Sequence, residues 1–171
     1  TTWLNRTLLP SPPARLGHAL AYDAARGRII LFGGTDYDNY LADTWEWDGT
    51  RWRILFPATS PPARSEHSMV YDSARGRVVL FGGYGNGGGL ADTWEWDGTN
   101  WSMSTPAASP SARRHHAMTW DVSRQRTVLF GGFDFGGAHL ADTWEWDGTN
   151  WSQSLPVTSP RPRRYPALAY D

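Results

Sequence analysis

The sequence predicts an all-β protein in which one unit of four antiparallel strands is repeated and the units pack as the blades of a β-propeller. Two observations carry this prediction. The decapeptide LADTWEWDGT occurs three times without substitution, at residues 41–50, 90–99 and 140–149. A Trp follows each copy, and one more precedes them, at Trp3, Trp52, Trp101 and Trp151. The successive steps are 49, 49 and 50 residues, a period typical of propellers or solenoids.

A second repeated block keeps the same phase and ends in a Gly-Gly pair. It occupies residues 13–34, 62–83 and 111–132, and its opening returns at 161–171. We therefore expect three complete blades between two partial ones. The expected division is the last strand of a preceding blade at 1–12, blades at 13–61, 62–110 and 111–160, and the first strand of a further blade at 161–171.

Four strands are predicted in the first unit, at residues 18–23, 28–32, 44–48 and 52–55. A turn follows the first strand, and Gly27 supplies its positive φ. The second strand is a continuous apolar run, as a strand buried on both faces requires. The third alternates, with Trp45 and Trp47 on one face, and Asp48-Gly49 is a hairpin signal before the fourth. No segment has a helical hydrophobic period. A four-stranded sheet that is apolar on both faces must stack on copies of itself.

Composition narrows the classes of function. The net charge of −1 offers no basic field for nucleic acid, and no apolar run approaches the ~18 residues of a membrane helix. The absence of Cys excludes disulfides, thiolate metal sites and Cys nucleophiles. We expect no cofactor. The compartment stays open between secretion or the cell surface and the cytoplasm.

The repeat is similar to the kelch repeat in three features: a Gly-Gly pair closing the second strand, an aromatic residue followed by Asp after the first, and a Trp entering the fourth. The residues that carry the likeness are Gly33-Gly34, Gly82-Gly83, Gly131-Gly132, Tyr22, Tyr71, Trp120, Trp52, Trp101 and Trp151. The resemblance covers essentially the whole chain. In particular, the chain resembles the kelch arrays of bacterial proteins of unassigned function. It implies a propeller of a family that mostly binds other proteins and only sometimes carries enzymes. The copper-radical oxidases on such propellers need a Cys, which this chain lacks.

Positions identical in every copy are interpreted as scaffold, because every copy shares the architecture. This assigns the repeated Trp pairs to packing, with a sugar-stacking platform as the alternative. It assigns the repeated carboxylates to turns and Arg pairing, with paired-acid chemistry as the alternative. His18, His67 and His116 open the first strands, and a metal-binding ring is the alternative to a structural role; the fourth copy has Pro166, so we predict no metal site. A calcium loop at residues 36–39 is an alternative that the other copies do not repeat.

Positions that differ between copies are the candidates for a binding site. They are the loops at residues 35–40, 84–89 and 133–139, and the pairs that follow the shared Arg. Antiparallel order puts both sets on one face of the propeller. Arg and aromatic residues are enriched at interaction hot spots. The predicted ligand-binding set is Arg15, Arg64, Arg113, Arg163, Tyr37, Tyr84, Phe133 and Phe135. The alternative for the arginines is that they bridge blades by pairing with the acidic third strand.

These observations favour a non-catalytic binding module whose loop face recognises a protein or another acidic ligand. The alternative is a carbohydrate-binding protein, or part of a propeller enzyme whose catalytic residues lie outside this chain. We also expect self-association through open blade edges. Such edges fit a fragment of a longer array, or a chain that builds a homo-oligomeric ring.

Overall fold

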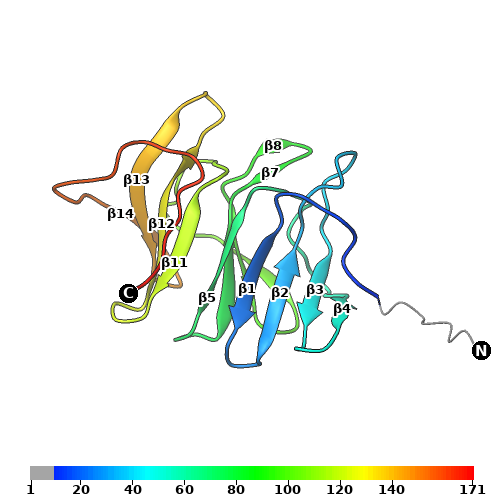
Figure 1. Cartoon of the computed structure of the whole chain (residues 1–171). Coiled ribbons are helices and arrows are strands. Elements are labelled where there is room, and N and C mark those ends of the chain that lie inside the picture. Colours follow the sequence, from blue (N-terminus) through cyan, green and yellow to red (C-terminus); the bar gives the residue numbers. More distant parts are fainter. Residues whose placement is uncertain (1–9) are drawn as a thin grey trace, which may run out of the picture.

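A computed structural model describes residues 10–171, and all regular structure in this range is β-strand. Three antiparallel four-stranded sheets follow one another along the chain (Figure 1). Blade 1 comprises β1 (Ala19–Asp23), β2 (Arg28–Phe32), β3 (Thr44–Trp47) and β4 (Trp52–Leu55). Blade 2 comprises β5 (Ser68–Asp72), β6 (Arg77–Phe81), β9 (Thr93–Trp96) and β10 (Trp101–Ser104). Blade 3 comprises β11 (Ala117–Asp121), β12 (Arg126–Phe133), β13 (His139–Trp146) and β14 (Trp151–Ser154). The prediction of four-stranded antiparallel blades is confirmed.

The strand positions follow from local sequence. In blades 1 and 2 the strands begin and end within one residue of the predicted positions, because turn residues bound each one. The β1–β2 and β3–β4 turns contain Gly27 and Gly49, with φ of 62° and 95°, where a residue with a Cβ would be strained. In the order β1-β2-β3-β4 each strand pairs with its sequence neighbour, so every connection within the blade is a hairpin.

Three features differ from the predicted strands. Blade 2 carries an extra hairpin, β7 (Tyr84–Gly85) and β8 (Gly88–Gly89), within the predicted loop at residues 84–89. In blade 3 the strands run on past the Gly-Gly pair to Phe133, with a register shift between Phe130 and Gly132. Residues 161–171, where the first strand of a further blade is expected, contain no strand in this structure. The strand expected at residues 1–12 falls mostly outside the described residues.

Alternate residues of each second strand serve the two faces of its blade. Ile30 and Phe32 face blade 2 and pack with Val78 and Leu80. The intervening residues of β6 point the other way, and Val79 and Phe81 form the core with blade 3. Each junction also buries a pair of Trp residues from the later blade, Trp96 with Trp101 and Trp146 with Trp151, none more than 2% exposed. The continuous apolar run of the second strand therefore has its predicted cause.

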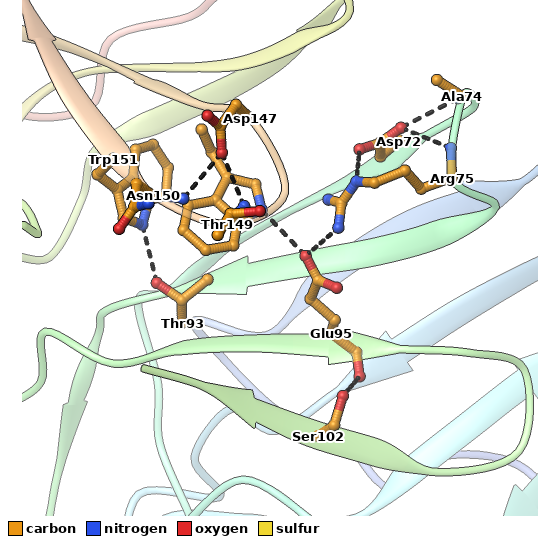
Figure 2. A network of polar contacts seen from close by, with 11 residues as sticks. Asp72, Ala74, Arg75, Thr93, Glu95, Ser102, Asp147, Thr149, Asn150 and Trp151 are labelled. Atoms are coloured by element: carbon orange, nitrogen blue, oxygen red, sulfur yellow. Dashed lines mark hydrogen bonds and ion pairs between the residues drawn. The ribbon is translucent and has the colours of Figure 1, made fainter. Parts of the chain in front are cut away.

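Polar contacts between blades add specificity to this packing. Trp151 Nε1 donates a hydrogen bond to Thr93 Oγ1 at 2.8 Å, and Trp101 donates the equivalent bond to Thr44 at 3.0 Å. Figure 2 shows the blade 2–blade 3 junction, where Glu95 Oε1 accepts from Arg75 at 2.6 Å. Trp146 Nε1 donates to the same oxygen at 3.0 Å. The repeated Trp, Thr and Glu residues are thus parts of the scaffold.

Candidate functional site: the loop face

The connections that vary between copies gather on one face of the molecule. In Figure 1 the β7–β8 hairpin and the β12–β13 turn lie at the top, and the β1–β2 turn lies at the opposite end. The segment before the first strand of each blade pairs with the loop that follows the second strand, through bridges Leu16–Thr35, Ser65–Tyr84 and Arg114–Phe133. We call this surface the loop face.

The three arginines Arg15, Arg64 and Arg113 are anchors inside their own blades. Arg64 holds both carboxylate oxygens of Asp92 at 2.6 and 2.7 Å and donates to the Gly82 carbonyl oxygen at 3.0 Å. The Arg64 side chain is fully buried. Arg113 makes the same contacts with Asp142 and Gly131, and Arg15 with Asp43 and Gly33. These bonds fasten the incoming chain to the end of the second strand.

This placement corrects the expectation that these arginines contact a ligand. Their donors are used within the blade, and their side chains are at most 3% exposed. The structure contains the alternative, in which each arginine pairs with the aspartate just before the third strand. Each pair lies within one blade, however, and does not bridge two blades. Arg163 is exposed and donates to the Arg161 carbonyl oxygen at 2.9 Å. Among residues 10–171 Arg163 has no carboxylate partner.

The paired carboxylates are stabilised in their charged form. Burial by itself would raise the pKa of Asp92, but the hydrogen bond and the charge of Arg64 outweigh it, so the pKa lies below its ordinary value. The same balance lowers the pKa of Asp43 and of Asp142. In each case a Trp Nε1 donates to the same carboxylate, from Trp45, Trp94 and Trp144.

Three of the four predicted aromatic residues converge on one side chain, Arg114. The Arg114 Cζ atom lies 5.6 Å from the ring centroids of Tyr84 and Phe133 and 5.9 Å from that of Phe135. Tyr84 and Phe135 are stacked, with centroids 5.4 Å apart. Phe135 reaches from blade 3 onto β8 and lies directly over Gly89, where a side chain would collide with its ring. The loops of blades 2 and 3 therefore form one surface.

Glu66 connects this surface to the start of the first strands. Its carboxylate lies 3.0 Å from Arg114 Nη1 and 2.9 Å from His115 Nε2. The His115 ring packs on Tyr165 with centroids 4.0 Å apart. Burial lowers the pKa of His115, and the Glu66 charge counteracts it. Glu66, Arg114 and His115 were not in the predicted ligand-binding set, although they belong to the variable pairs that follow the shared Arg. Their charged side chains, at positions that differ between copies, were the sequence signal that could have identified them.

A cleft of ≈ 390 Å³ opens between the loops of blades 1 and 2. Thr35, Tyr37, Asp38, Asn39, Tyr40, Ser65, Glu66, Tyr84 and Arg114 line this loop-face cleft. The wall from blade 1 is shaped by Asp36 Oδ1, which accepts hydrogen bonds from the backbone N–H groups of Asp38 at 3.1 Å and Asn39 at 2.7 Å. Tyr37 has a left-handed φ of 79° and is 82% exposed. The fourth predicted aromatic residue thus lies in the cleft, across from Tyr84.

The histidines that open the first strands do not meet. His67 and His116 are buried in separate blade junctions, each edge-on to a phenylalanine, Phe32 and Phe81 respectively. Within the part of the chain that the structure describes, no group of three or more His, Asp or Glu residues could hold a metal ion. The same residues contain no helix long and apolar enough to span a membrane.

Comparison with known proteins agrees with this architecture. A family model described as the KLHDC2/KLHL20/DRC7 Kelch-repeats domain matches residues 2–170. No curated protein matches the chain. The family match spans all three blades and the variable loops between their strands.

Proposed function

Because the chain belongs to the kelch-repeat family, whose domains are in general non-catalytic modules of protein–protein interaction, we propose that it binds a partner protein through the loop-face cleft. The observation that carries the proposal is the cleft itself. Its volume lies in the range of known ligand sites, and its walls come from loops that differ between the copies. Tyr37, Tyr40 and Tyr84 supply the aromatic surface that is enriched at interaction hot spots.

A random dodecapeptide display library, selected on the immobilised chain, tests this proposal. The affinities of the selected peptides are then measured for the wild type, Tyr37→Ala and Tyr22→Ala. Tyr22 is a matched control, because it is a 59% exposed tyrosine at the end of β1 next to the opposite turn. We expect Tyr37→Ala to weaken binding about tenfold and Tyr22→Ala to leave it unchanged.

Equal affinities for all three proteins would contradict binding at the cleft. A glycan array run beside the library addresses the carbohydrate-binding alternative. If the wild type retains a glycan, Tyr37→Ala abolishes that binding and no peptide is selected, the ligand is a sugar and not a protein. An Asp and an Asn beside tyrosines in the cleft are the observation that keeps this alternative.

Self-association is a second proposal, supported by the two outer blade faces. Trp47 and Trp52 of blade 1 are the equivalents of the Trp pairs that blades 2 and 3 bury, yet they stay partly exposed. At the other end Val128, the equivalent of Ile30 and Val79 that the internal junctions bury, stays partly exposed. Contact between such faces of separate molecules would bury the same kinds of surface that the internal junctions bury.

A further inference from the structure

The charges at the loop-face cleft differ from those expected from the sequence. With Arg15, Arg64 and Arg113 committed inside their blades, the charged residues that line the cleft are Asp38, Glu66 and Arg114. Glu66 and Arg114 form an ion pair at 3.0 Å and offset each other. Asp38 forms no ion pair with any of residues 10–171. The cleft therefore carries one uncompensated negative charge, and an acidic ligand would be repelled there.

The rings beside Asp38 can accept a cation. Tyr37 and Tyr40 flank this carboxylate on the 35–40 loop and line the cleft with it. Tyr40 also meets Tyr84 edge to face at 5.8 Å, which holds the two walls of the cleft against each other. The faces of tyrosine rings attract Lys and Arg side chains through the ring quadrupole. A carboxylate next to such rings adds a charge-assisted hydrogen bond.

The molecule already contains an example of this recognition. The guanidinium of Arg114 lies over Tyr84 at 5.6 Å and is paired with the carboxylate of Glu66. That arrangement of one ring, one carboxylate and one guanidinium occupies one wall of the cleft. The opposite wall presents the same two groups, a tyrosine ring and the carboxylate of Asp38, without the cation. Guanidinium groups stack on aromatic faces and bind carboxylates in the same geometry.

We infer that the loop-face cleft takes an arginine or lysine side chain of an extended partner segment, paired with Asp38 and stacked on Tyr37 or Tyr40. This inference rests on the proposed function and names its ligand chemistry. It reverses the acidic ligand expected from the sequence. The cleft, at ≈ 390 Å³, has room for one long side chain and the backbone on either side of it.

Four blocked tripeptides test the inference: Ac-Gly-Arg-Gly-NH₂ and the same peptide with Lys, Leu or Glu in the centre. Each is titrated into the ¹⁵N-labelled full chain, and the amide shifts of residues 35–40 and of Glu66 are followed. We expect saturable shifts with the Arg and Lys peptides and at least fivefold weaker binding of the Leu peptide. The Glu peptide should cause no shifts. Raising NaCl from 50 to 500 mM should weaken the binding of the Arg and Lys peptides and leave that of the Leu peptide unchanged.

Two variants localise the charge. Asp38→Asn should lower the affinity for the Arg peptide about fivefold, since it removes one ion pair at an accessible site. Asp171→Asn removes the same charge from an exposed position outside the cleft and should have no effect. Equal binding of the Leu and Arg peptides, or an unchanged affinity in Asp38→Asn, overturns the cation preference while leaving peptide binding at the cleft intact. Absence of shifts with the Arg and Lys peptides also overturns it, and the library selection then decides separately whether the cleft binds protein at all.

Discussion

Arg113 holds both carboxylate oxygens of Asp142 at 2.7 Å, across 29 residues of sequence, with its guanidinium fully buried. Two further hydrogen bonds to the Ser111 carbonyl oxygen and hydroxyl, and one to the Gly131 carbonyl oxygen, complete its five donors. The side chain thereby fixes the connection into blade 3 against the end of the second strand.

Arg113→Ala should lower the free energy of unfolding by about 3 kcal/mol, because it leaves Asp142 and a carbonyl oxygen without their partner. Arg163→Ala, at the equivalent position without a carboxylate partner in the described structure, is the matched control and should cost less than about 1 kcal/mol. Urea unfolding followed by tryptophan fluorescence measures both. Equal losses in the two variants would mean that the buried pair is not an anchor.

Thr93→Val tests the contact between blades 2 and 3. The substitution keeps the side-chain shape but removes the acceptor of Trp151 Nε1, so it should destabilise the chain by about 1–3 kcal/mol. Thr143→Val makes the same change in blade 3, where no Trp of residues 10–171 donates to the hydroxyl. It should stay within about 0.5 kcal/mol of the wild type. Thermal or urea unfolding compares the two; a larger loss in Thr143→Val would contradict the assignment.

Stability should fall in mild acid because of His67 and His116. Burial, followed by the charge of the neighbouring Arg64 or Arg113, lowers the pKa of each to about 3. The unfolded chain keeps the ordinary value of 6.5, so between pH 6.5 and 3 the unfolded state binds more protons and folding weakens as the pH falls. Each histidine should contribute a slope of ~1.4 kcal/mol per pH unit in the middle of this window.

Unfolding free energies at pH 7, 6 and 5 give that slope. His67→Phe removes one titrating group and should make the slope shallower, whatever its effect on stability at pH 7. His139→Phe, an exposed histidine in β13, is the control and should leave the slope unchanged. A slope in His67→Phe as steep as in the wild type would show that the buried imidazole is not responsible.

The open blade faces predict association in solution. At micromolar concentration the chain should have a mass above its 19.1 kDa, measured by light scattering after size exclusion. Val128→Glu places a charge on the outer face of blade 3 and should lower the associated fraction, whereas Val122→Glu changes an exposed residue next to β11 and should not. A monodisperse species of 19.1 kDa would contradict the role of these faces.

The blades could be predicted because their determinants are local and repeated three times. A Gly at each tight turn and a run of apolar residues in each second strand depend on neighbours within a few residues. The extra β7–β8 hairpin was missed because residues 84–89 are rich in glycine and lack the alternation of a strand. The strand expected at residues 161–171 stays a prediction, because a strand forms only with a pairing partner, which local sequence cannot supply.

The sequence by itself determined the repeat, the four strands of each blade and the face on which the variable residues lie. Only the tertiary structure decided which of those residues face solvent. Arg15 and Arg64 look like surface cations in the sequence, but each meets its carboxylate 28 residues away and is buried by that pairing. Arg114 meets Glu66 from the neighbouring blade, 48 residues away. Charge pairing depends on distance in space, and the stacking of blades sets that distance.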